Sequence, residues 1–211
     1  MSGSPVSPTA KRIVCVGDSL TVATGSAELD KWPVRIALAL EKESPGEHSL
    51  FIRAWNGATT FEVLQKITSE VGYLLPATVI VTLGVNDAHV PAFCRTPQVG
   101  IEDFASNLRE IHRLISDEGG NTIFVVEHVP VASPAYSPGN GRTYAENFAP
   151  YRAEILKVAG ELNVPAFDIP SLMAARGIGS RDIVTDDGLH LSRNGNWIYA
   201  GLIFSQLRDF L

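Results

Sequence analysis

The sequence has few cysteines, little charge, and no long run of hydrophobic or like-charged residues. Only two of its 211 residues are cysteines, Cys15 and Cys94, which excludes a disulfide framework and fits a reducing compartment. Charged residues make up 19%, with 17 Lys and Arg against 23 Asp and Glu, giving a formal net charge of −6. This balance argues against a nucleic-acid partner, because binding to phosphates draws on clustered Lys and Arg.

The sequence also lacks a recognisable membrane span or export signal. The longest uncharged stretch, residues 71–86, contains Pro76 and is too short and too polar to cross a bilayer. Residues 1–10 are rich in Ser and Pro, with no positive charge before an apolar core, and do not resemble a signal peptide. We therefore expect a cytoplasmic protein, unless a leader was removed, with residues 1–10 as a flexible tail and 11–211 as one domain.

Short runs of Ile and Val alternate along the chain with segments of helical periodicity. Such runs, without polar alternation, are typical of strands buried on both faces, as in parallel sheets. The alternation predicts βαβ crossovers, and therefore an α/β fold with helices on both faces of a five-stranded parallel sheet. The predicted strands are residues 13–16, 50–54, 79–83, 122–126 and 164–167.

The clearest predicted helix spans residues 101–116, where Ile101, Phe104 and Leu108 recur at spacings of three and four. For the last helix, Ser192 or Asn194 is the expected N-cap. The one long irregular stretch, residues 129–143, is rich in Pro, Ser and Gly, and loops of this length are usually functional or disordered. The predicted helices are residues 32–43, 61–71, 101–116, 152–162 and 195–207.

Polar clusters follow the first three predicted strands, at residues 17–20, 56–60 and 84–87, and a fourth, residues 186–190, precedes the last helix. In open α/β sheets, ligands bind at the carboxyl ends of the strands. The first three clusters are therefore expected on one edge, where the fourth could join them.

These clusters hold the components of acyl transfer. A serine such as Ser19 is a weak nucleophile until a base such as His190 takes its proton, and Asp187 could orient that base. The oxyanion that forms needs donors, which the backbone N–H groups of Ser19 and Gly57 and the side-chain amide of Asn86 could supply. The sequence therefore predicts a Ser/His/Asp site with an oxyanion hole.

Each component alone has an ordinary structural explanation. Ser19 could cap a helix, Gly57 could permit a tight turn, Asn86 could form an Asx turn, and residues 187–190 could be a surface turn. The catalytic interpretation rests on the joint order of the clusters and on their shared placement.

The motifs Gly17-Asp18-Ser19-Leu20, Gly57, Gly84-x-Asn86-Asp87 and Asp187-x-x-His190 together resemble the GDSL, or SGNH, hydrolases over nearly the whole chain. The resemblance implies a flavodoxin-like three-layer α/β/α fold. It also implies Ser19 as nucleophile, His190 as base and Asp187 as its orienting acid, with Ser19, Gly57 and Asn86 forming the oxyanion hole.

Trp32-Pro33 and residues 186–190 are similar to the bacterial thioesterase/lysophospholipase branch of this family. The family's Asp-x-x-His spacing selects Asp187 rather than its neighbour Asp186. The chain departs from the branch at residues 56–59, where Asn-Gly-Ala-Thr replaces Ser-Gly-Asp-Thr, which leaves the flanking pocket chemistry open.

Other hydrolase and cofactor motifs are missing. Thr21 stands where the Gly-x-Ser-x-Gly elbow of α/β-hydrolases has its second glycine. There is no His-Glu-x-x-His motif, and residues 139–141 fail the dinucleotide fingerprint at its third glycine. We therefore expect no metal and no cofactor.

The expected function is a serine esterase or thioesterase that acts on a small-molecule ester or thioester. An acyltransferase that uses the same acyl-serine is the alternative among enzymes, and a non-catalytic flavodoxin-like binding module is the alternative among binding proteins. The oligomeric state is not readable from the sequence.

Residues 87–98 and 129–143 are expected to wall the substrate pocket. Ala88, Val90 and Phe93 offer apolar surface for an acyl chain or, equally, for the core, and Tyr136 and Tyr144 could contact substrate or stabilise the loop. From these residues we expect a short- to medium-chain acyl preference.

Overall fold

The computed structural model describes residues 10–211, which are built around a five-stranded parallel sheet in the order β2-β1-β3-β4-β5. This strand order is that of flavodoxin-like folds, so the predicted fold class is confirmed. The strands are β1 (Lys11–Gly17), β2 (His48–Ala54), β3 (Thr78–Thr82), β4 (Asn121–Val126) and β5 (Ala166–Asp168).

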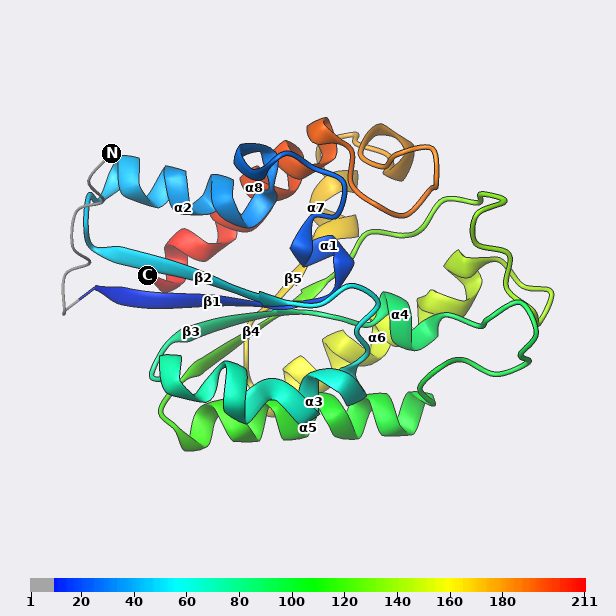
Figure 1. Cartoon of the computed structure of the whole chain (residues 1–211), viewed down its shortest axis with the longest axis horizontal. Helices are drawn as coiled ribbons and strands as arrows, with labels where there is room; N and C mark the ends of the chain where they lie inside the picture. The colour runs from blue at the N-terminus through cyan, green and yellow to red at the C-terminus, as the bar shows by residue number, and fades with distance from the viewer. Residues whose placement is uncertain (1–9) are drawn as a thin grey trace.

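Helices cover both faces of the sheet, with α2 and α8 on one side and α3 and α5 on the other in Figure 1. Successive strand residues point to opposite faces, so β1 contributes Val14 and Val16 to one core and Ile13 and Cys15 to the other. The helices are α1 (Ser19–Val22), α2 (Trp32–Glu43), α3 (Thr60–Glu70), α4 (Val85–Ala88), α5 (Ile101–Asp117), α6 (Tyr144–Leu162), α7 (Ile169–Ala174) and α8 (Arg193–Leu207).

The largest departure from the predicted elements is α6, which begins at Tyr144 rather than at residue 152. A capping box starts it: the Glu146 N–H donates to Thr143 Oγ1 at 3.1 Å, and the Thr143 N–H donates to Glu146 Oε2 at 2.7 Å. Pro150 is accommodated inside this helix. The short helices α1, α4 and α7 were not predicted, because a turn or two of helix carries no periodic signal.

Strand boundaries differ by a few residues. β5 begins at Ala166, so residues 164 and 165 precede it, and β3 ends at Thr82, one residue before the predicted end. At the start of α8, Ser192 is the N-cap, because its side chain accepts the N–H of Gly195 at 3.0 Å. The irregular stretch predicted for residues 129–143 has no helix or strand.

Nine of the ten residues of the predicted N-terminal tail lie outside the described part of the chain, which begins at residue 10. The uncharged stretch 71–86 holds β3 rather than one long helix. Between residues 10 and 211, no helix is both long and apolar enough to cross a membrane.

The short helices α1 and α4 and the loops after the strands gather at one edge of the sheet, opposite the start of β1 and the C-terminus (Figure 1). At this edge β1 must turn sharply. A Cβ on Gly17 would lie 2.7 Å from the Thr82 carbonyl oxygen of the neighbouring strand, so only glycine fits there. The close approach of β1 and β3 at Gly17 therefore sets the direction in which the chain leaves β1.

Two glycines of α8 provide a test of how tightly this helix is seated. A Cβ on Gly195 would lie 1.9 Å from the Ile183 carbonyl oxygen, whereas one on Gly201 would meet nothing within 4 Å. We expect Gly195→Ala to lower the free energy of unfolding by about 1–3 kcal/mol through overpacking. Gly201→Ala should raise it by about 0.5–1 kcal/mol, because alanine favours the helix. Urea denaturation measures both, and equal midpoints for the two variants would contradict this packing.

Candidate active site

Ser19 lies directly after β1, as the first residue of α1, and its side chain is almost wholly buried. Asp18 caps this helix, because its Oδ1 accepts the N–H of Leu20 at 2.8 Å. Because Ser19 is the first residue of a helix that begins at the sheet edge, the helix backbone sets the direction of its side chain, and no flexible loop does so. The local fold therefore presents the Ser19 hydroxyl at the carboxyl edge, as predicted.

A continuous chain of hydrogen bonds runs from Ser19 through His190 to Asp187. Ser19 Oγ lies 3.0 Å from His190 Nε2, and His190 Nδ1 lies 2.7 Å from Asp187 Oδ2. The neighbouring carboxylate of Asp186 is exposed and takes no part in this chain. The structure thus brings together the three side chains that the sequence predicted to meet.

The turn that carries Asp187 and His190 is held by hydrogen bonds from its backbone to the Asp187 side chain. Asp187 Oδ1 accepts the N–H groups of Leu189 and His190, both at 2.9 Å, and the Thr185 hydroxyl at 2.8 Å. Burial alone would raise the pKa of Asp187, but the bonds from His190, Leu189 and Thr185 together lower it to about 2. The carboxylate is therefore ionised and fixed against the imidazole.

Buried polar side chains connect the Ser19 segment with the His190 segment. The indole N–H of Trp32 donates to the Leu20 carbonyl at 2.8 Å, and the Trp32 backbone N–H donates to Asn196 Oδ1 at 3.1 Å. The amide of Asn196 in turn donates to the Ser26 hydroxyl at 2.9 Å and to the Ser192 carbonyl at 3.1 Å, with the Leu191 carbonyl as a longer third contact at 3.4 Å. The residues that follow Ser19 and His190 are thereby held by one network.

Of the predicted oxyanion donors, Gly57 lies in the loop after β2, and Asn86 lies in the short helix α4, which follows β3. Gly57 has a φ of +74°, which favours glycine. Among the described residues, no acceptor is paired with the backbone N–H of Gly57. The amide of Asn86 donates to Asp18 Oδ2 at 2.8 Å and to the Ala58 carbonyl at 3.1 Å. Both amide hydrogens of Asn86 therefore have protein partners, a constraint that its position in the sequence did not reveal.

Three buried carboxyl groups lie behind this edge: Asp18, Asp87 and Glu127. Burial raises the pKa of Asp18 to about 7, and that of Asp87 to about 6 despite hydrogen bonds from Thr60. Burial, followed by the negative charge of Asp18, raises the pKa of Glu127 well above its usual range. Glu127 accepts the N–H of Val85 at 3.0 Å through Oε2, while its Oε1 has no partner.

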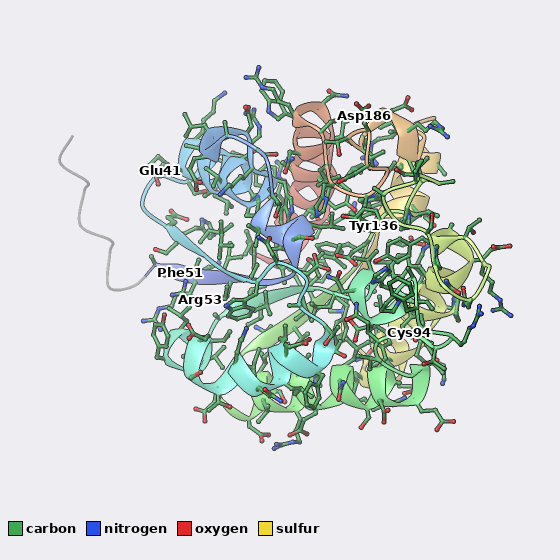
Figure 2. The ribbon with its side chains drawn as sticks, turned by 45° about the vertical axis from the view of Figure 1, so that its right-hand side comes forward. Glu41, Phe51, Arg53, Cys94, Tyr136 and Asp186 are labelled. Carbon is green, nitrogen blue, oxygen red and sulfur yellow. The ribbon has the colours of Figure 1, made fainter. Side chains whose placement is uncertain are left out.

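The aromatic residues named from the sequence have different environments. Tyr144 is buried, and its hydroxyl donates to the Val85 carbonyl at 2.8 Å, so it joins α6 to α4 rather than facing a ligand. Tyr136 is half-buried, and its ring centroid is 6.5 Å from that of His190 and 6.3 Å from that of His89. In the view of Figure 2, Tyr136 lies between Asp186 and Cys94.

The apolar residues after β3 also differ in their exposure to solvent. Ala88 and Val90 are buried in the core and cannot contact an acyl chain, whereas Phe93 is fully exposed. Cys15 is buried and Cys94 is exposed, and both are free thiols. Among residues 10–211, no three His, Cys, Asp or Glu side chains form a group that could hold a metal ion.

Sequence reasoning missed Glu127, His128 and Asn196 as parts of the site. Glu127 and His128 directly follow β4, so the same strand-end rule that identified Ser19 and Asn86 applied to them. Asn196 lies inside α8, where nothing in the sequence distinguishes a buried amide from an exposed one.

Comparisons with known proteins identify a family and agree on the fold. The profile of the GDSL-like lipase/acylhydrolase family matches residues 15–198, and no curated protein sequence matches the chain. A lipase/acylhydrolase from Enterococcus faecalis is 21% identical, with 95% of this chain and 97% of that one covered and a TM-score of 0.78.

Two further solved structures have the same fold. TesA is 19% identical, with 95% of this chain and 100% of that one covered and a TM-score of 0.73. A catalytic mutant of an acetylxylan esterase from Geobacillus stearothermophilus is 15% identical, with 97% and 95% covered and a TM-score of 0.74. At these identities, the structural likeness establishes the fold alone.

Glu127 makes stability depend on pH. Its folded pKa lies above the unfolded value of 4.5, so the folded state holds a proton that the unfolded chain releases above that pH. The free energy of unfolding therefore falls as pH rises, by at most about 1.4 kcal/mol per pH unit from this group. We expect Glu127→Gln, which cannot ionise, to lose stability less steeply than wild type in urea denaturation as the pH rises above 4.5.

The exposed Glu118→Gln is the matched control for Glu127→Gln, because it makes the same change of charge on the surface. Its stability should follow the wild-type dependence on pH. Parallel curves for wild type and Glu127→Gln would show that the buried carboxyl does not hold a proton in the folded state.

Proposed function

Because the chain belongs to the GDSL-like lipase/acylhydrolase family, we propose that it is a serine hydrolase that cleaves carboxylic esters or thioesters through an acyl-serine intermediate. The observation that carries the proposal is the hydrogen-bonded chain from Ser19 Oγ through His190 to Asp187. A serine hydroxyl within 3.0 Å of an imidazole whose other nitrogen is held by a carboxylate has the arrangement needed to attack a carbonyl carbon.

In the first step, His190 Nε2 takes the proton of Ser19 as Oγ bonds to the acyl carbon. The imidazolium that forms is stabilised by Asp187, which is ionised at neutral pH. Collapse of the tetrahedral intermediate breaks the bond to the leaving alcohol or thiol, which departs with the proton from His190. Water then attacks the acyl-serine by the same sequence of proton transfers and releases the acid.

The negative charge on the substrate oxygen is stabilised by three hydrogen-bond donors. The backbone N–H groups of Ser19 and Gly57 supply two of them, and the amide of Asn86 supplies the third. Asn86 is held by its 2.8 Å bond to Asp18 and gives its other N–H, now on the Ala58 carbonyl at 3.1 Å, to the oxyanion. Asp18 thereby orients a donor and does not react itself.

The leaving group lies on the His190 side of the acyl carbon, because His190 must protonate it. Tyr136 lies on that side, with His89 next to it, so the alcohol or thiol meets the Tyr136 ring. Since Ala88 and Val90 are buried in the core, less apolar surface remains for a long acyl chain than the sequence suggested. A short- to medium-chain acyl group fits this arrangement, and one structural relative is an acetylxylan esterase.

The triad is tested by substitution of its nucleophile and its acid. Ser19→Ala should abolish hydrolysis of p-nitrophenyl acetate, because no nucleophile remains. Asp187→Asn should lower kcat on the order of 10⁴-fold, because an amide favours the wrong imidazole tautomer.

Asp186→Asn is the matched control for Asp187→Asn, because it removes the neighbouring exposed carboxylate. Its kcat should equal that of wild type. Equal rates for Ser19→Ala and wild type, or equal losses in the two Asp variants, would overturn the proposed roles.

Chain-length preference is measured with p-nitrophenyl esters from acetyl to palmitoyl. We expect kcat/KM to be highest for short and medium chains and to decline with longer ones, because Ala88 and Val90 are unavailable to line an acyl groove. A profile that is flat or rises to palmitoyl would contradict this preference while leaving the triad intact.

A further inference from the structure

The residues on either side of His190, Leu189 and Leu191, both have backbone carbonyls that lie within hydrogen-bond distance of buried side chains. His128 Nε2 lies 2.8 Å from the carbonyl oxygen of Leu189, and Asn196 Nδ2 lies 3.4 Å from that of Leu191. His128 directly follows β4 and is completely buried, and it is not part of the hydrogen-bonded chain from Ser19 to Asp187.

The hydrogen-bond pattern around His128 determines its tautomer. The Leu189 carbonyl can only accept, so His128 Nε2 must carry the hydrogen that it shares. The Tyr199 hydroxyl already accepts the backbone N–H of His128 at 2.8 Å, which leaves its own hydrogen free for His128 Nδ1 at 2.7 Å. A neutral imidazole thus satisfies every polar atom of the pair, and burial lowers the pKa of His128 to about 4.

We propose that His128 is a positioning residue for the catalytic base: its Nε2–H, oriented by Tyr199, holds the Leu189 carbonyl and thereby the distance from His190 to Ser19. The inference rests on the proposed function, since it assigns His128 a part in the same reaction. Tyr199 belongs to α8, as does Asn196, so both carbonyls beside His190 are anchored to one helix.

Without the donor on His128, the carbonyl of Leu189 is left buried and unpaired. An unpaired buried carbonyl is costly, so the turn would shift until that oxygen finds another donor. Because His190 is the next residue, the shift moves its Nε2 relative to Ser19. Misplacement of about 1 Å lowers rates by about 10²-fold in comparable cases. Substrate binding would be affected less, because His128 is buried and does not face the substrate.

Substitution of His128 by Gln and by Asn separates the effect of losing the hydrogen bond to Leu189 from the effect of losing the imidazole ring. His128→Gln places its amide nitrogen near the position of Nε2 and can still donate to Leu189, whereas His128→Asn places its amide near Nδ1 and cannot reach. We expect His128→Asn to lower kcat by about 10²-fold with KM nearly unchanged, and His128→Gln to retain most of the wild-type kcat. His112→Asn is the control, since His112 pairs with Thr122 at the opposite end of β4.

Equal kcat values for the Asn and Gln variants, whether both intact or both reduced, would overturn the role of the Leu189 bond. A second readout is the low-field NMR signal of the proton between His190 Nδ1 and Asp187. We expect this signal to shift or broaden in His128→Asn and to persist in His128→Gln and His112→Asn. The signal does not require turnover, so it still tests the positioning role if wild type hydrolyses no ester and the proposed function fails.

Discussion

The hydrogen bond between Ser19 and His190 is the contact that requires the whole chain to be folded. It joins residues separated by 171 positions over a distance of 3.0 Å. Ser19 is placed by β1, next to the centre of the sheet, while His190 comes from the turn before α8, the last long helix. Every strand and crossover between them must therefore be in place before these two side chains can meet.

Buried polar groups, rather than the hydrophobic core alone, set the precision of this contact. Packing of Val and Ile side chains brings the two segments to one edge, but apolar contacts are not directional. Trp32 and Asn196 bind the backbone on either side of the site through hydrogen bonds of defined geometry. Such networks are rigid only when each member has a partner, because an unpaired buried polar group is costly.

The buried carboxyls behind the edge add an electrostatic cost to the site. Asp18 and Asp87 both have raised pKa values, because burial disfavours their charged forms. Asp18 nevertheless caps α1 and holds the amide of Asn86, and Asp87 binds Thr60 at the start of α3. These two acids connect the segments that follow β1, β2 and β3. Their burial lowers the stability of the fold, and their hydrogen bonds fix the geometry of the site.

The fold class, the family and the meeting of Ser19, His190 and Asp187 could be predicted from the sequence, because strand periodicity and short motifs are local signals. The start of α6 was also encoded locally, in the capping box of Thr143 and Glu146, although Pro150 made the helix look shorter. Three features could not be predicted and follow from tertiary packing: Tyr144 is buried while Tyr136 lies beside His190, both amide hydrogens of Asn86 are engaged, and His128 binds the Leu189 carbonyl. Each of these depends on which distant backbone atom lies opposite a side chain, and that pairing arises only when the sheet and its helices pack together.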